Sequence, residues 1–161
     1  MKTLEEMRDA IMAYVRVCWA GAGELDSPAA MIFGPGDGCA IIATDLHPLD
    51  LALHLSGKAQ RDGADGVALA VEAWAATDEP ALREHLLHGG EIRTFPGRHE
   101  SLTVICEDRE GRRKEWSGRI TPAQGGSERT AALGEIEPSP MQRSYRSIRF
   151  FSETVRREAR G

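Results

Sequence analysis

The 161-residue sequence contains no asparagine and only three cysteines, Cys18, Cys39 and Cys106. Without asparagine there is no acceptor for N-glycosylation. The cysteine count is odd, and no pair has the Cys-x-x-Cys spacing of a zinc or redox motif. Cys39 and Cys106 lie inside apolar stretches. We therefore interpret all three as reduced thiols of the core, which indicates a cytoplasmic compartment.

Long apolar runs and a basic leader are also missing. No uninterrupted apolar run reaches the roughly 20 residues that a membrane-spanning helix needs. The first residues carry acidic side chains within a helical pattern. A signal peptide instead has a basic region before an apolar one. We therefore expect a cytosolic protein.

The sequence lacks the short motifs of the common catalytic classes. No serine lies in a Gly-x-Ser-x-Gly elbow, and no His-Glu-x-x-His zinc motif occurs. The glycine-rich stretch at 34–38 lacks the Lys-Ser/Thr ending of a phosphate-binding loop, and it leads into an apolar run instead of a helix. These absences favour a protein that is not an enzyme, and we expect no cofactor.

Charge is unevenly distributed along the chain. There are 20 Lys and Arg against 25 Asp and Glu, which gives a net charge of −5. An acidic chain is a poor general binder of nucleic acid, because affinity for phosphates comes from many cations. Residues 141–161, however, contain 6 basic and 2 acidic residues. A basic tail that docks on an acidic body, within one chain or between two, is the arrangement that this asymmetry predicts.

Hydrophobic spacing predicts a helix and then a β-hairpin at the start of the chain. Thr3 and Glu6 have the spacing of a capping box, and apolar residues then recur at helical intervals until Gly21. The apolar runs 30–33 and 39–43 flank a turn of glycines and proline. Such a turn between two short apolar runs is typical of a hairpin.

The rest of the chain alternates between helical and strand patterns. Pro48 begins a second helix that runs through Ala59 and ends near Gly63. Residues 67–74 alternate with period two and predict a strand, and residues 78–88 predict a short helix. Two further strands are expected at 101–107 and 113–120, and an apolar stripe of Tyr145, Ile148, Phe151 and Val155 marks a terminal helix.

This order, α-β-β-α-β-(α)-β-β-α, predicts an α+β fold. We expect a single domain with a mainly antiparallel sheet of about five strands and helices packed on it. The expected organisation is an α+β core domain at 1–120, a Gly/Pro-rich connection at 121–140 and a basic terminal helix at 141–161.

Part of the pattern resembles a diffuse group of small uncharacterised proteins from bacteria and phages. In that group a strand that ends in Glu-Ala-Trp precedes a Pro-x-Arg-x-Glu loop and a hairpin. The corresponding stretches here are Glu72-Ala73-Trp74 and Pro96-Gly97-Arg98-His99-Glu100. The segment 78–88 is longer than the usual spacer. The resemblance implies a fold and no reaction, since the group has no assigned activity.

The strand at 67–74 also suggests a binding face. Glu72 and Trp74 lie on the strand face opposite Val67, Leu69 and Val71. We expect an aromatic face that also contains Trp116 and either Leu102 or Ile105. Such a face must be covered, either by the terminal helix or the connection of the same chain, or by a partner with Trp as its anchor. The candidate partner-binding residues are Glu72, Trp74, Arg98, Glu100 and Trp116.

Histidines are the candidate metal ligands. His85 and His88 are three residues apart and so lie on neighbouring positions of one helical face, with His99 beyond the following loop. A structural zinc site usually shows four Cys or His ligands at compact spacing, which this sequence lacks. The competing interpretation is that His85 and His88 lie in the last turn of their helix because a partly protonated imidazole is attracted to the negative end of the helix dipole.

The predicted terminal helix has two interpretations. Its arginines are Arg143, Arg146, Arg149, Arg156, Arg157 and Arg160. Beside aromatic residues they suit contact with RNA, DNA or anionic lipid. Alternatively, the helix docks on the body of the same chain and turns its charges to water or to acidic residues.

The first functional hypothesis from the sequence is therefore a non-enzymatic protein-interaction module. It would act as an accessory or regulatory factor and would bind another protein or a second copy of itself. Two alternatives remain open: a small metal-dependent or hydrolytic enzyme that uses His85, His88 and His99, and a protein that contacts nucleic acid through its Arg-rich tail.

Overall fold

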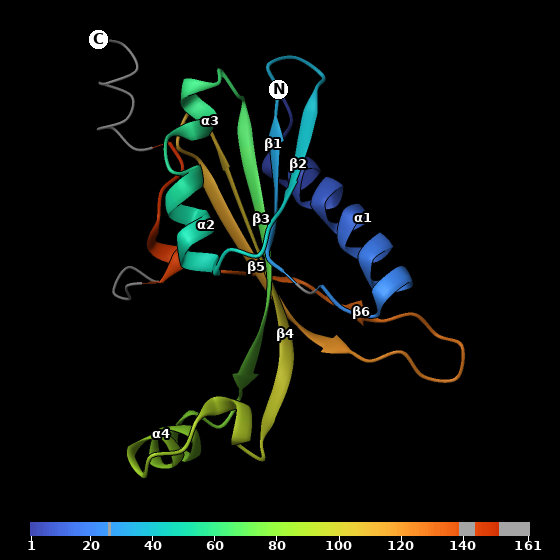
Figure 1. Cartoon of the computed structure of the whole chain (residues 1–161), viewed down its shortest axis with the longest axis vertical. Coiled ribbons are helices and arrows are strands. Elements are labelled where there is room, and N and C mark those ends of the chain that lie inside the picture. Colours follow the sequence, from blue (N-terminus) through green and yellow to red (C-terminus); the bar gives the residue numbers. More distant parts are fainter. Residues whose placement is uncertain (26, 139–143, 152–161) are drawn as a thin grey trace.

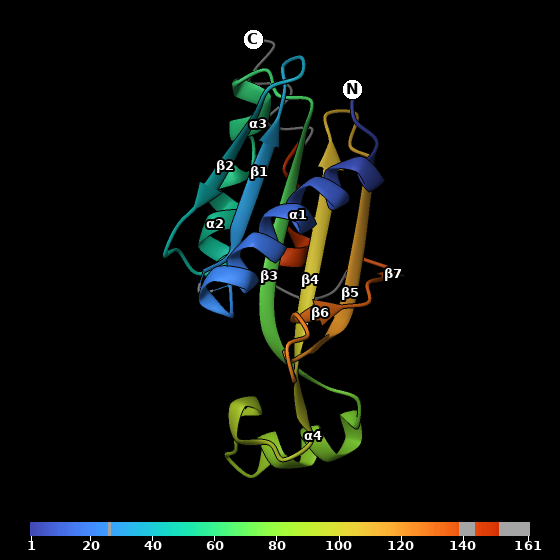
Figure 2. The same ribbon diagram turned by 90° about the vertical axis from the view of Figure 1, so that its right-hand side faces the viewer.

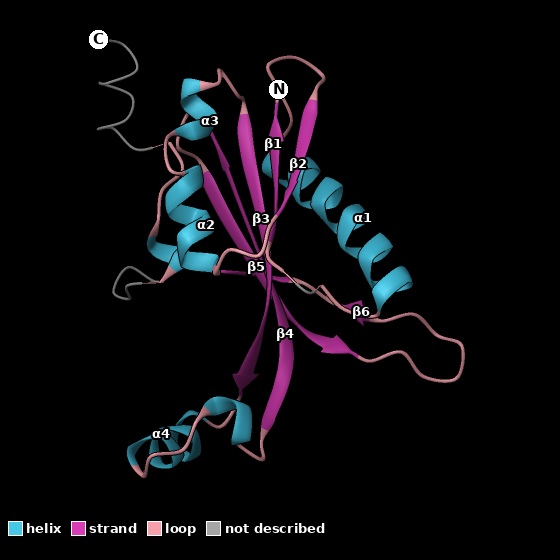
Figure 3. Cartoon of the chain, in the orientation of Figure 1, coloured by secondary structure: helices cyan, strands magenta, loops and turns pink. Residues whose placement is uncertain are grey.

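The computed structural model describes residues 1–25, 27–138 and 144–151. Within these residues, seven strands form one antiparallel sheet with the order β2-β1-β3-β4-β5-β6, and β7 also pairs with β5. Helices lie on both sides of the sheet (Figures 1 and 3). The strands are β1 (Ala29–Phe33), β2 (Cys39–Ala43), β3 (Gly66–Ala76), β4 (Arg98–Asp108), β5 (Arg113–Thr121), β6 (Thr130–Ala131) and β7 (Gly134–Ile136). The helices are α1 (Leu4–Ala22), α2 (Pro48–Leu55), α3 (Lys58–Arg61) and α4 (Glu79–Leu87), with 3-10 turns η1 (Ile92–Thr94) and η2 (Tyr145–Ser147).

Helix α1 begins where the sequence predicts. The Thr3 hydroxyl accepts a hydrogen bond from the Glu6 amide at 3.1 Å, and the Glu6 carboxylate accepts one from the Thr3 amide at 2.8 Å. This reciprocal pair satisfies two amides that the first turn leaves without partners, which confirms the capping box. The helix ends at Gly23, whose φ of 80° is the left-handed conformation of a helix C-cap.

The side chains of β3 point alternately to the two sides of the sheet, so the core has two layers. Ala68 and Ala70 face α1, whereas Val67, Leu69 and Val71 face α2. We call these two sides of the sheet the α1 face and the α2 face. On the α1 face, α1 buries Leu4, Met7, Ile11, Met12, Val15 and Trp19. On the α2 face, α2 and α3 pack together with Phe150 and Phe151 from the end of the described chain.

The expected α+β class and antiparallel sheet are confirmed, but the count of five strands is wrong. The two additional strands, β6 and β7, lie in the connection 121–140, which the sequence left without structure. They form because the chain returns across β5 at very close range. A Cβ atom on Gly118 would lie 2.3 Å from the carbonyl oxygen of Ala132, so glycine permits this approach.

The single helix expected from Pro48 through Ala59 is divided into α2 and α3. Gly57 separates them with a φ of 86°, which is left-handed and so interrupts the helix. Its amide donates a hydrogen bond to the carbonyl oxygen of Phe150 at 2.8 Å. The break therefore depends on a contact with a segment more than ninety residues away in the chain.

The described part of the predicted terminal helix, residues 144–151, contains one 3-10 turn and no α-helix. Its backbone is held by side chains of the sheet instead. The Phe151 amide donates to the Glu107 carboxylate at 2.9 Å, and the Arg113 guanidinium donates to two carbonyl groups of the segment. The remainder of the predicted helix, with Arg143, Arg156, Arg157 and Arg160, lies outside the described residues.

Across the described part of the chain, no helix combines the length and the apolar character that crossing a membrane requires.

Candidate functional site

Strands β3 and β4 continue beyond the body of the sheet as a two-stranded extension (Figures 1 and 2). We call residues 72–102 the arm; at its base Ser101 and Leu102 still pair with β5. Each of the two strands has 11 residues, against five in β1. The end of the arm carries α4, which buries none of its side chains and leaves Leu86 and Leu87 exposed.

Two sequence motifs face one another across the arm. Trp74 of β3 pairs with Glu100 of β4, and Ala76 pairs with Arg98. Residues that pair directly in an antiparallel sheet lie on the same face, so the Glu-Ala-Trp and Pro-x-Arg-x-Glu motifs both contribute to the α1 face of the arm. The structure thus brings together four of the five candidate partner-binding residues: Glu72, Trp74, Arg98 and Glu100.

Arg129 joins the two carboxylates of this face. Its guanidinium donates to Glu72 at 2.6 Å and to Glu100 at 2.8 Å. Glu72 also accepts hydrogen bonds from the Trp19 indole and from the Leu25 amide. The Arg129 side chain is 7% exposed and lies 5.1 Å above the Trp19 ring. These contacts fix the face to α1 and to the chain that follows it.

The two carboxylates favour the charged form of Arg129. Burial lowers the pKa of Arg129, but hydrogen bonds with Glu100 and Glu72 outweigh it and raise that pKa above its ordinary value. A guanidinium is charged in proteins at any ordinary pH. The cluster therefore places two carboxylates around one permanent cation.

Trp74 is the exposed aromatic residue of the site. Its side chain is 42% exposed, and the Arg98 guanidinium lies 4.9 Å from the centre of its ring. Arg98 is itself held by a hydrogen bond to the Phe95 carbonyl at 3.1 Å. A pocket of about 260 Å³ lies beside the indole and is lined by Glu24, Leu25, Glu72, Ala73, Trp74 and Glu100.

Trp116, the fifth candidate, does not belong to this site. It is buried on the α1 face under α1, and Arg8 lies 5.0 Å above its ring. Leu102 shares this cluster, whereas Ile105 lies on the α2 face. The aromatic face is covered chiefly by α1, which the sequence did not predict. Of the two expected covers within the chain, the connection contributes Ala131 and Leu133 at the margin, whereas the described terminal residues Phe150 and Phe151 pack on the α2 face.

The three candidate metal ligands have separate surroundings. His85 donates to the Glu91 carbonyl at 2.9 Å, and His88 donates to the Glu84 carbonyl at 2.8 Å. His99 pairs with Ala75 and so lies on the face of the arm opposite Trp74. Within the described residues, no group of three or more His, Cys, Asp or Glu is arranged to hold a metal ion.

The described arginines of the tail contact acidic residues of the same chain. Arg146 donates to Glu115 at 3.2 Å, and the Arg149 guanidinium lies 3.9 Å from the Glu107 carboxylate. Both carboxylates are fully buried. This arrangement is tail-to-body docking within one chain.

Sequence reasoning missed Arg129 and Trp19 as parts of the site. In the sequence, Trp19 is indistinguishable from the other apolar residues on the buried side of the first helix. Arg129 lies in a Gly/Pro-rich connection. The one feature of the sequence that distinguishes it is that 121–140 contains no other basic residue. Comparison of the chain with protein-family models, with curated proteins and with solved structures finds no match.

Replacing Arg129 by alanine is expected to lower the free energy of unfolding by about 1–3 kcal/mol, because two carboxylates lose a charged donor. Chemical denaturation measures the change. Arg119→Ala is the matched control, since Arg119 is exposed on β5, and such surface changes cost less than about 0.5 kcal/mol. Equal losses in the two variants would show that Arg129 does not brace the site.

Proposed function

We propose that this protein is a non-enzymatic protein-interaction module that binds its partner with the Trp74 face of the arm. The observation that supports this most directly is the exposed Trp74 ring beside Arg98. The strands that carry these two residues, β3 and β4, extend beyond the body (Figure 2). Contiguous exposed apolar surface marks interaction sites, and Trp74 borders a pocket that Leu25 and Ala73 also line.

The composition of the face suits a protein interface. Tryptophan and arginine are the residues that most often dominate binding energy, with polar residues around them. Trp74 and Arg98 are in contact, and Glu100 and Glu72 supply the polar surroundings. A partner would bury the indole and form hydrogen bonds with Glu100, which is 41% exposed.

The face is also held in place before any partner arrives. Arg129 links Glu72 to Glu100, and Arg98 is tied to the Phe95 carbonyl. A site whose side chains are already ordered loses less conformational entropy on binding. The exposed Leu86 and Leu87 of α4 would extend the contact toward the end of the arm.

Trp74→Ala is expected to weaken partner binding by about thirtyfold or more, the loss of about 2 kcal/mol that is typical of an interface anchor. The test places a photoreactive residue at Ala76, which pairs with Arg98 on the same face, in the 161-residue chain and crosslinks it in an extract of the native host. Excess unlabelled wild-type chain should abolish the crosslinked product. The Trp74→Ala chain should compete about thirtyfold less well.

A photoreactive residue at Leu53 is the matched control, because Leu53 is exposed on α2 and so lies on the other face of the sheet. Circular dichroism verifies that Trp74→Ala remains folded. The proposal fails if the position-53 probe captures the same product, or if Trp74→Ala competes as well as the wild type.

A further inference from the structure

Strand β2 forms one edge of the sheet and is apolar along its whole length. It pairs with β1 and, within the described residues, with no other strand. Its sequence Cys-Ala-Ile-Ile-Ala contains no charge and no proline. Four of its five residues are exposed, and Ile41 is 50% exposed. Cys39 is one of the exposed residues, so the expectation that all three cysteines lie in the core is wrong.

The register shows which backbone groups of β2 face outward. The Gly34 amide donates to the Gly38 carbonyl at 2.6 Å, so these two residues form a hydrogen-bonded pair next to the Phe33–Cys39 pair. Hydrogen-bonded and non-hydrogen-bonded pairs alternate along an antiparallel ladder. Ala40 and Ile42 therefore point their backbone groups toward β1. The groups of Cys39, Ile41 and Ala43 point toward the open edge.

Native sheets usually protect such an edge. They place lysine or proline on it, twist it with a bulge or cover it with another segment, because unpaired amides and carbonyls recruit further strands. None of these devices is present in β2 within the described residues. An apolar open edge is the geometry of strand addition, in which a partner segment continues the sheet.

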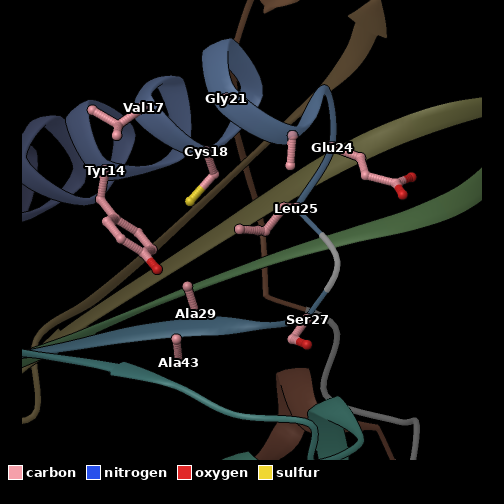
Figure 4. Close-up of a pocket in the computed structure, with 10 residues that line it drawn as sticks. Tyr14, Val17, Cys18, Gly21, Glu24, Leu25, Ser27, Ala29 and Ala43 are labelled. Carbon is pink, nitrogen blue, oxygen red and sulfur yellow. The ribbon is translucent and has the colours of Figure 1, made fainter.

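A pocket lies on the α1 face beside this edge (Figure 4). It has a volume of about 260 Å³ and is lined mainly by apolar residues of α1, by the chain after it and by the ends of the two strands at Ala29 and Ala43. Tyr14 and Cys18 point from α1 toward the strands. A hydrogen bond with Cys18 and partial burial raise the pKa of Tyr14, so its phenol stays neutral.

The chain segment that forms this edge carries charges of one sign only. Residues 17–57, which contain both β1 and β2, include five acidic residues and no Lys or Arg. Asp37 and Asp45 are exposed just beyond the two ends of β2. A second copy that paired symmetrically about Ile41 would bring Asp37 opposite Asp45 of that copy at each end. Like charges directly opposite are destabilising, so a partner with basic ends is favoured over a second copy.

We propose that β2 is a docking edge for an extended segment of a partner protein that adds to the sheet as a further strand. The segment inserts an apolar side chain into the pocket beside Ala43 and carries Lys or Arg near its ends. This surface is additional to the Trp74 face and does not depend on it.

The test selects ligands from a random short-peptide display library with the full-length protein as bait. Selected peptides are expected to alternate apolar residues and to have basic ends. Replacing the basic residues at the peptide ends by glutamate should weaken binding about tenfold at low salt, because the attraction to Asp37 and Asp45 is lost. Binding should slow hydrogen exchange of the amides of Cys39, Ile41 and Ala43 and leave those of Ala40 and Ile42 unchanged.

Two variants locate the bound peptide. Ile41→Lys places a charge on the edge, and Ile41→Pro removes an outward amide that does not pair with β1, so both should reduce peptide binding at least tenfold. Leu53→Lys is the matched control, since it adds the same charge at an exposed position of α2. If Ile41→Pro does not fold, Ile41→Lys together with the hydrogen-exchange measurement still shows whether the peptide binds at β2.

The proposal is overturned if no peptide is enriched, or if the enriched peptides bind Ile41→Lys as tightly as they bind the wild type. It is also overturned if sedimentation shows a dimer that Ile41→Lys dissociates, since a second copy would then occupy the edge. Retained binding by Leu53→Lys together with loss in both Ile41 variants supports it.

Discussion

Replacing Arg113 by alanine is expected to lower the free energy of unfolding by about 3–5 kcal/mol, the cost of removing the hydrogen-bonded cation of a buried carboxylate. The Arg113 side chain is 3% exposed, and its guanidinium lies 3.1 Å from the Glu107 carboxylate, which is fully buried. It also donates to the carbonyl oxygens of Ile148 and Arg146 and lies 5.6 Å from the Phe150 ring. The Arg113 side chain therefore balances the charge of the buried Glu107 carboxylate, and it also holds residues 144–151 by hydrogen bonds.

Burial lowers the pKa of Arg113, while Glu107 and Glu115 oppose that effect. The guanidinium nevertheless stays charged, so the loss should appear at every pH near neutrality. Urea denaturation measures the free energy, and hydrogen exchange of the Phe151 amide measures whether the segment has left the sheet. Arg109→Ala is the control, because Arg109 is 56% exposed. A loss below about 1 kcal/mol for Arg113→Ala would contradict the assigned role.

The second large effect is expected for Phe150→Ala, with a loss of about 3–5 kcal/mol from removing a large buried ring. Phe150 is fully buried on the α2 face, where it packs among residues of α2, α3 and the sheet. Its carbonyl also accepts the hydrogen bond of Gly57, so displacement of the segment removes a partner at the break between α2 and α3.

Phe150→Leu is the matched variant, since it keeps an apolar side chain and should lose less than half as much stability as alanine. Thermal and urea unfolding of the three proteins give the comparison. Hydrogen exchange at Gly57 should accelerate in Phe150→Ala and change little in Phe150→Leu. The packing role is contradicted if both variants unfold at the wild-type denaturant concentration.

Local patterns predicted much of the fold. The capping box at Thr3, the period-two alternation of β3 and the glycine-rich hairpin turn each depend on residues close together in the chain, and each agrees with the structure. The placement of Glu72 and Trp74 opposite Val67 also follows from alternation alone, and the structure confirms it. Four of the candidate partner-binding residues meet on one face because both of their motifs lie on neighbouring strands.

Other features depend on contacts between segments far apart in the chain. Trp116 was expected with Trp74, yet its strand β5 lies beyond β4 and its ring is under α1. Arg129 completes the site from a segment without periodicity, and its partners, Glu72 and Glu100, lie 57 and 29 residues away in the sequence. The interruption of the helix at Gly57 and the non-helical course of 144–151 both depend on contacts between distant segments.

Residue spacing and charge are enough to predict the class of fold, the two faces of its central strand and the asymmetry between an acidic body and a basic tail. They do not predict which carboxylates pair with which arginines, which tryptophan stays exposed or which edge of the sheet stays open. Those outcomes depend on the order in which strands lie side by side, and strand order is set by the summed packing of the whole chain and not by any local pattern.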